Sequence, residues 1–172
     1  LREKVKSLKS VIFTHEHKDH IAGLDDVRPF NYKEKREMNV YASARVKEAL
    51  LREYHYIFAD HKYPGVPNVN LSVFGNGKFE IDKNIKIEPI EVFHYKLPIY
   101  GFRIGDITYI TDAKTISESE KEKIHGSNTL IINALRKEPH ISHFNLKEAL
   151  SFINEINPKK AYLTHISHLF GK

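Results

Sequence analysis

Short hydrophobic runs alternate along the chain with segments in which apolar residues recur at helical spacing. The runs are rich in Val, Ile, Tyr and Phe and are bounded by turn-forming residues, which is typical of β-strands. Strands that alternate with amphipathic helical segments predict a layered α/β fold. The expected strands are VIFT at 11–14, NVYA at 39–42, LSVF at 71–74, IKIEPIEVF at 85–93, IYGFRI at 99–104, ITYIT at 107–111, TLIIN at 129–133 and AYLT at 161–164.

Turn and capping residues refine this pattern. Gly105-Asp106 lies between two expected strands and predicts a tight hairpin, so the sheet should be mixed. Helix N-caps are expected at Ser43, Ser117 and Asn145, and the last two are each followed by a glutamate three residues later. Helical spacing in the last helix predicts one stripe that faces the core, formed by Leu146, Ala149, Leu150, Ile153 and Ile156.

The organisation of the chain is that of one domain. We find no internal repeat and no linker, so a single domain is expected over residues 1–172. The opening segment LREKVKSLKS resembles the last turns of a helix, and the chain starts without Met, so this domain is expected to be a fragment of a larger fold. Residues 56–70, with Pro64, Gly65 and Pro67, predict one long connection.

Composition narrows the class of protein. With 41% hydrophobic and 11% aromatic residues the chain suits a globular domain, and without cysteine it has neither disulfides nor a thiolate zinc site. A reducing cytoplasm is therefore the expected location. No apolar run approaches the roughly 20 residues that span a bilayer, so no membrane partner is expected. The net charge of +5 favours an anionic substrate, although a lysine-rich solvated surface explains it equally well.

The histidines carry a more specific signal than the charge. Eleven are present, and the densest cluster is His15-Glu16-His17-Lys18-Asp19-His20, directly after the first expected strand. An extended segment directs His15 and His17 to one side, and a tight turn into a helix brings Asp19 and His20 to a neighbouring point. Imidazole and carboxylate are the ligands that zinc, manganese and iron take at hydrolytic centres. The alternative, a polar loop with solvated histidines, does not account for such density.

This H-x-H-x-D-H pattern resembles the metallo-β-lactamase superfamily. In that family a further histidine, a bridging aspartate and a final histidine follow at strand ends, and this chain has His94, Asp112 and His165 after three expected strands. Singly, each of the three has an ordinary structural interpretation, and their shared context favours a ligand role. The resemblance implies an αβ/βα sandwich with mixed sheets, here without the family's N-terminal strands. It also implies two divalent metal ions, zinc or manganese with iron as a further choice, one held by His15, His17 and His94, the other by Asp19, His20 and His165, with Asp112 between them.

Residues around these ligands indicate a branch of the superfamily. Phe93-His94-Tyr95-Lys96 differs from the corresponding stretch of glyoxalase-like thiolesterases, and an aspartate at position 112 differs from the cysteine of common zinc β-lactamases. The span from His94 to Asp112 resembles the phosphodiesterase branch, which includes tRNA 3′-processing nucleases and the cyclic-phosphate phosphodiesterase of phosphonate catabolism. His140-Ile141-Ser142-His143 resembles the His-x-x-His segment of the phosphonate-pathway enzymes. His143 is thereby implied to assist the phosphate or the leaving group, unless both histidines merely precede a capped helix.

The resemblance implies a metal-dependent phosphodiesterase that uses a metal-activated hydroxide on a small or cyclic phosphodiester. Asp19 and His143 are the expected catalytic residues, Asp19 to orient the nucleophile and His143 to donate a proton or bind phosphate. Alternatives are a tRNA 3′-processing endoribonuclease and a thioester or lactone hydrolase; a nucleic-acid-binding module without turnover is less favoured. RNA is a less favoured partner because residues 56–70 lack a basic cluster. A homodimer is an assembly that only the resemblance suggests, and His168 matches no ligand position.

Overall fold

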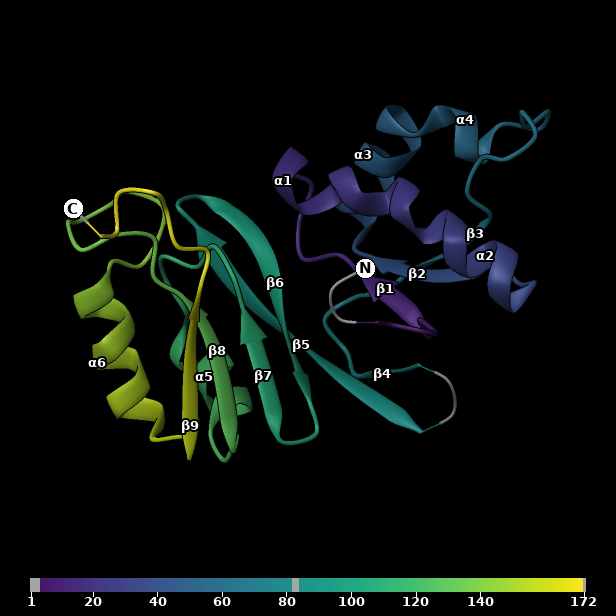
Figure 1. The fold of residues 1–172 in the computed structure, drawn as a ribbon. Coiled ribbons are helices and arrows are strands. Elements are labelled where there is room, and N and C mark those ends of the chain that lie inside the picture. The colour runs from purple at the N-terminus through teal and green to yellow at the C-terminus, as the bar shows by residue number, and fades with distance from the viewer. Residues whose placement is uncertain (1–3, 82–83, 172) are drawn as a thin grey trace. The chain divides into compact units, whose positions relative to one another are not determined.

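A computed structural model of the chain describes residues 4–81 and 84–171, which form two compact units, Leu1–Gly75 and Asn76–Lys172 (Figure 1). We call them the N-terminal unit and the C-terminal unit, and each is described by itself. The expectation of a single domain over residues 1–172 stays a prediction.

The N-terminal unit is built on a parallel sheet in the order β1-β2-β3. Its strands confirm the first three expected from the sequence. Residues 4–9, expected to end a helix, form no regular secondary structure, because Leu8 donates its amide to Glu34 Oε1 (2.9 Å) and its carbonyl accepts from Arg36 (2.6 Å). The elements are β1 (Ser10–Ile12), α1 (Lys18–Ile21), a 3-10 helix η1 (Ala22–Val27), α2 (Arg28–Glu34), β2 (Met38–Ala42), α3 (Ala44–Glu53), α4 (His55–Phe58) and β3 (Val69–Val73).

Buried and partly exposed side chains alternate along β2, and the buried ones contribute to the core of the N-terminal unit. In β2 every second residue is buried, namely Met38, Val40 and Ala42. Ser43 caps α3 by accepting a hydrogen bond from the amide of Val46, as expected from the sequence. The connection before β3 is shorter than expected, because α4 occupies its first residues.

The C-terminal unit contains a mixed sheet in the order β4-β5-β6-β7-β8-β9, as the hairpin signal predicts. Gly105 adopts a left-handed conformation (φ 57°) in the turn between β6 and β7, which pair antiparallel. The remaining five expected strands are confirmed, whereas β4 was missed. The elements are β4 (Phe79–Ile81), β5 (Ile85–His94), β6 (Leu97–Ile104), β7 (Ile107–Ile110), α5 (Glu118–Ile124), β8 (Thr129–Asn133), α6 (Leu146–Ile156) and β9 (Lys160–Thr164).

Strand direction decides where polar residues gather in this unit. β7, β8 and β9 pair parallel, and β5 runs the same way because two antiparallel steps, through β6, separate it from β7. The carboxyl ends of these four strands therefore meet at one edge of the sheet. Polar residues lie at these strand ends or directly after them in the chain. Binding sites of α/β folds commonly form at such an edge.

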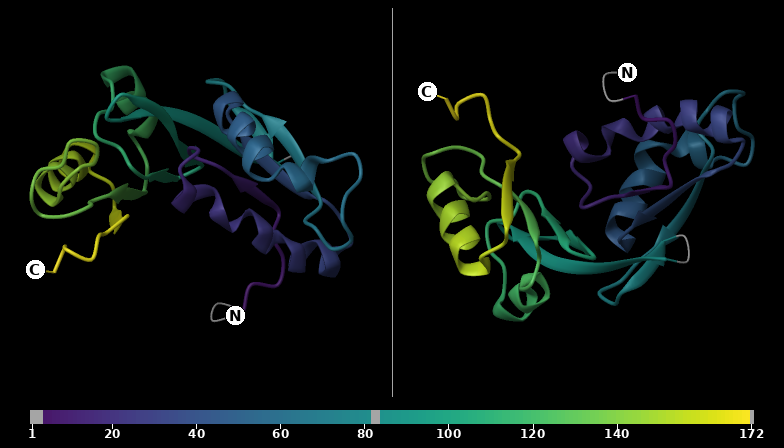
Figure 2. Two further views of the ribbon diagram at one scale, coloured as in Figure 1. Left: turned by 90° about the horizontal axis from the view of Figure 1, so that it is seen from above. Right: turned by 60° about the horizontal axis from the view of Figure 1, so that its bottom comes forward.

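Helices α5 and α6 pack on the sheet to form one core with its apolar residues, and α6 lies beside the parallel strands in both views of Figure 2. Asn145 caps α6 with a full capping box to Glu148. The expected apolar stripe of α6 needs one correction. Leu150 is 47% exposed, while Phe152, which was not in the stripe, is buried beside Ala149 and Ile156.

Among the described residues, no helix combines the length and the apolar character needed to cross a membrane.

Candidate metal centre

The H-x-H-x-D-H segment forms a tight turn at the carboxyl end of β1. His17 stands before α1, and its carbonyl accepts hydrogen bonds from the amides of His20 (3.0 Å) and Ile21 (3.1 Å). This closes the turn that was expected to redirect Asp19 and His20. Because the extended chain enters a helix after His17, ligand-type side chains before and after this residue come close together.

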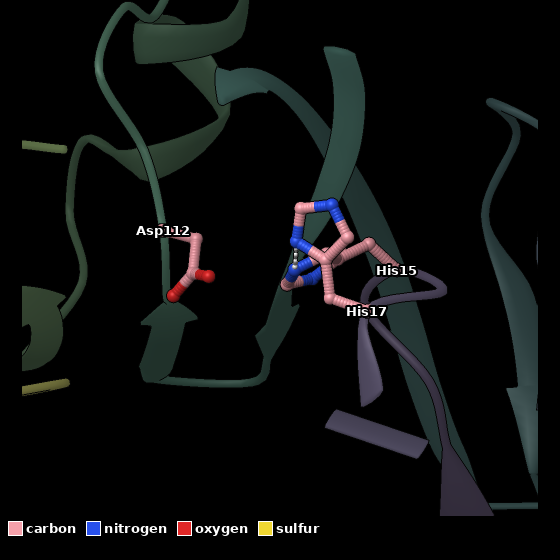
Figure 3. A group of neighbouring side chains, drawn as sticks. All are labelled: His15, His17 and Asp112. Atoms are coloured by element: carbon pink, nitrogen blue, oxygen red, sulfur yellow. Dashed lines mark hydrogen bonds between the residues drawn. The ribbon is translucent and has the colours of Figure 1, made fainter. Parts of the chain in front are cut away.

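The side chains of this turn are in mutual contact. His15 is 1% exposed, and its Nε2 lies 3.1 Å from His17 Nδ1, the contact drawn in Figure 3. The His15 and His20 ring centroids are 4.1 Å apart, and His20 Nε2 lies 3.2 Å from Asp19 Oδ2. The four expected ligands of the N-terminal unit thus form one cluster of three imidazoles and a carboxylate.

In the C-terminal unit, His94 at the end of β5 is held in a defined tautomer. Its Nδ1 lies 2.9 Å from the carbonyl oxygen of Ser142 and 3.1 Å from that of Asp112. Because a carbonyl only accepts, Nδ1 carries the proton of the neutral ring and donates. Nε2 then carries the lone pair, which is the state of a histidine that binds a metal while its second nitrogen is anchored to the backbone.

Asp112 and His165 follow the ends of β7 and β9 in left-handed backbone conformations, with φ of 57° and 52°. Asp112, drawn in Figure 3, is 2% exposed and accepts a hydrogen bond from Thr111 Oγ1 at 2.7 Å. His165 Nε2 lies 3.2 Å from Asp112 Oδ1. A left-handed conformation costs a residue other than glycine about 1–2 kcal/mol, and such strain is concentrated at functional sites.

His143 lies among three other imidazoles. Its ring centroid is 4.5 Å from that of His94 and 5.0 Å from those of His140 and His165. Burial lowers the pKa of His143 to about 4, with the nearby Asp112 carboxylate opposing the shift. The ring is therefore neutral at neutral pH.

These donor groups fit a divalent cation. Ligand atoms of His94, Asp112 and His143 all lie within 4.8 Å of one another. Nδ1 of His143 is buried, and no group of the described residues hydrogen-bonds to it. A buried polar atom without a partner is rare in folded proteins, and imidazole nitrogens beside a carboxylate are a typical ligand set for zinc or manganese.

Within each unit the structure therefore groups the residues expected from the sequence. His143, which the sequence placed outside the ligand set, lies with the expected ligands His94 and Asp112. His168 is exposed, and no contact of its side chain is recorded in the described part of the chain.

The sequence analysis did not identify the residues that support the expected ligands. Asn133 appeared only as the end of a strand, yet its side chain binds both backbone groups of Ala113, next to Asp112. Thr111 and Ser142 were likewise unassigned. Thr111 and Asn133 could have been found from the sequence, because each is a polar residue at the carboxyl end of an apolar run.

Comparisons with known proteins agree with this architecture. Residues 1–166 match the family model of the beta-lactamase superfamily domain. A curated octanoyltransferase of Porphyromonas gingivalis (strain ATCC BAA-308 / W83) is 36% identical over 166 residues, which cover 95% of this chain and 33% of that protein. The chain thus spans about one third of the length of this curated relative.

Two solved structures extend the comparison. The crystal structure of a diphosphatase from the PhnP family is 32% identical with a TM-score of 0.87, covering 98% of this chain and 64% of that one. Human tRNase Z, short form, is 15% identical with a TM-score of 0.71, covering 95% of this chain and 74% of that one. These likenesses confirm the expected fold class.

Proposed function

The chain belongs to the beta-lactamase superfamily, and on this premise we propose that it carries the two-metal centre of a hydrolase that cleaves a small phosphodiester. One observation carries the proposal. His94 donates from Nδ1 to two backbone carbonyls, which leaves the lone pair on Nε2, and one of its ring nitrogens lies within 4.8 Å of ligand atoms of Asp112 and His143.

Each unit carries a part of the ligand set that the family resemblance implies. Both sets stand at the carboxyl ends of strands, β1 in one unit and β5, β7 and β9 in the other. Two bound divalent ions supply a water of lowered pKa and offset the negative charge of the phosphoryl oxygens. His15, His17 and His94 would hold one metal, Asp19, His20 and His165 the other, and Asp112 would bridge them.

The residues of the chain position the reacting groups. Asp19, the most exposed carboxylate of the turn, would orient the attacking water. His143 is neutral at neutral pH because burial lowers the pKa of its ring. Its single N–H would donate a hydrogen bond to a phosphoryl oxygen or to the leaving oxygen. Thr111 donates to Asp112 (2.7 Å) and so fixes the carboxylate of the proposed bridge.

Several observations favour phosphoryl over acyl substrates. The two similar solved structures are named a diphosphatase and a tRNase, and the diphosphatase is 32% identical to this chain. The octanoyltransferase name belongs to a protein of which this chain covers 33%, so it assigns no acyl transfer to these residues. A small diester is preferred to RNA because residues 59–68, before β3, hold one lysine and no arginine.

A parallel assay tests the proposal. The purified protein, loaded with zinc or manganese, is offered bis(4-nitrophenyl) phosphate, a thioester and a lactone at equal concentration. Hydrolysis of the phosphodiester that is abolished by a chelator and restored by metal supports the proposal. Turnover of the thioester or lactone alone would contradict it.

A further inference from the structure

A groove in the C-terminal unit lies between α6 and the segment that leads from β7 into α5. Its volume is about 310 Å³, which falls within the range of pockets that hold small organic molecules. The apolar part of its lining is Ile116, Phe144 and Phe152, and the rings of the two phenylalanines stand 5.9 Å apart at an angle of 33°. We call this cavity the α6 groove.

The walls of the α6 groove are fixed by hydrogen bonds. On one side, the Phe93 amide donates to the carbonyl oxygen of Thr115 at 2.9 Å, and the Lys114 amide donates to the carbonyl oxygen of Phe93 at 2.7 Å. On the other side, Glu148 closes the capping box of α6 with Asn145. A ligand would therefore order little of the protein on binding, which lowers the entropic cost.

Two lysines connect the walls, and they differ in the number of carboxylates that they meet. Lys121 Nζ lies 2.8 Å from Glu118 Oε1 and 2.7 Å from Glu155 Oε1, so two carboxylates share one ammonium group. Glu118, and then Glu155, raise the pKa of Lys121 accordingly. Lys114 Nζ donates to Glu148 Oε1 at 2.7 Å, and this is its one carboxylate partner among the residues that the structure describes.

Lys114 therefore has the capacity for a second carboxylate. An ammonium group carries three donors, and the Lys114 side chain is only 22% exposed, so water reaches it poorly. Both oxygens of Glu148 are already engaged, one by Lys114 and the other by the amide of Asn145. A carboxylate from a ligand would give Lys114 the arrangement that Lys121 has, through a charge-assisted hydrogen bond.

The apolar lining indicates what the rest of the ligand is. Tilted or offset packing of a further aromatic ring on Phe144 and Phe152 is favourable beyond the area that it buries. From Glu148 to Glu155 the groove follows two turns of α6, about 10 Å at the helical rise per residue. This length accommodates one ring and a short chain that ends in a carboxylate.

We propose that the α6 groove binds a small aromatic carboxylate, with the carboxylate on Lys114 and the ring against Phe144 and Phe152. The expected metal ligands, all of them described by the structure, lie outside the lining of the groove. The site is therefore independent of the proposed function, and the two are tested separately.

Three probes that share one ring test the site: 3-phenylpropionate, 3-phenylpropanol and 3-phenylpropylamine. In the ¹⁵N-labelled, zinc-loaded protein, 3-phenylpropionate should shift the amide signals of Thr115 and Ser151, which line the groove. The alcohol should bind roughly tenfold more weakly or worse, because it forms no charge-assisted hydrogen bond, and the amine should not bind. Equal binding of the carboxylate and the alcohol would overturn the proposal, as would shifts confined to His94 and His165, which would place the carboxylate at the metal.

Two lysine variants test the contact with the carboxylate. Lys114→Gln should raise the Kd of 3-phenylpropionate roughly 10–100-fold and leave the weak binding of the alcohol unchanged. Lys121→Gln is the matched control, since it removes an equal charge from the same groove. Its effect should be about threefold or less, because salt screens a charge that does not touch the ligand. Equal losses in the two variants would contradict a specific contact with Lys114.

A variant that fills the groove tests the place of binding. Ser151 is exposed and lines the groove, so Ser151→Phe should abolish the binding of 3-phenylpropionate. Asn154→Phe, at an exposed position of the same helix outside the groove, should bind like the wild-type protein. Undiminished binding by Ser151→Phe would overturn the site. Circular dichroism and melting identify any misfolded variant, and the three probes on the wild-type protein then decide the matter.

Discussion

The side chain of Asn133 binds both backbone groups of Ala113: Oδ1 accepts from the amide at 2.8 Å, and Nδ2 donates to the carbonyl oxygen at 3.0 Å. Asn133 is fully buried at the end of β8. It therefore ties the end of one parallel strand to the residue after Asp112, and it helps to hold Asp112 in its left-handed conformation.

Asn133→Ala should lower the free energy of unfolding by about 2–4 kcal/mol, because two buried backbone groups lose their partners. Chemical denaturation measures the loss. Asn154→Ala, an exposed position on α6, is the control and should stay within about 0.5 kcal/mol of the wild-type protein. If Asn133→Ala is as stable as the control, Ala113 is held by other contacts.

Asp112→Asn should reduce the metal content. The change keeps the shape of the side chain and removes the negative charge that two cations would share, so metal and activity should fall together and added metal should restore part of the activity. Elemental analysis after dialysis measures the metal per chain. Asp60→Asn, at an exposed position, should retain the wild-type content, and a full content in Asp112→Asn would remove Asp112 from the ligand set.

His143→Ala distinguishes a metal ligand from a residue that acts on the substrate. We expect both metals to stay bound and phosphodiester turnover to fall roughly 10²–10⁴-fold if His143 acts as a general acid. A diester with an alkyl leaving group should then lose more than one with an aryl leaving group. His125→Ala, an exposed histidine, is the control.

The result for His143→Ala has two informative alternatives. Equal losses on the alkyl and aryl diesters would reject the acid role and favour a hydrogen bond to phosphate, which agrees with the lowered pKa of His143. Loss of metal would show that His143 is a ligand, as its grouping with His94 and Asp112 allows.

The phenol of Tyr56, in the N-terminal unit, should ionise at a higher pH than an ordinary tyrosine. Burial, together with a hydrogen bond to Asp25 Oδ2 at 2.7 Å, raises the pKa of its phenol to about 12. Because this pKa exceeds the value of about 10 for an unfolded tyrosine, the interaction stabilises the fold fully below pH 10 and the benefit is lost as the pH rises through about 12.

The stability difference between wild-type protein and Tyr56→Phe, measured by denaturation, should therefore shrink between pH 10 and pH 12. Ultraviolet titration of phenolate should show one high-pH ionisation missing from the variant. Tyr63→Phe, an exposed tyrosine, serves as the control. A constant difference over this range would mean that the Tyr56 phenol ionises at an ordinary pH.

Local patterns in the sequence were enough to identify most elements and ligand candidates. Eight strands were recognised from their apolar runs, and the caps at Ser43, Ser117 and Asn145 were correct, because side-chain alternation and capping depend on neighbouring residues. The H-x-H-x-D-H turn was recognised for the same reason. Leu150 was misassigned because helical spacing defines a stripe, whereas the rotation of α6 against the sheet decides which edge of the stripe is covered.

The supporting contacts were decided only by the tertiary structure. Asn133 meets Ala113 across 20 positions of the chain, and His94 meets the carbonyl of Ser142 across 48. No local pattern records such distances, because they depend on which strands pair and in which direction. The sequence alone thus determined which residue types are available for chemistry. Strand order and packing determined the tautomer of His94 and the conformation of Asp112, since each depends on partners brought together by the fold.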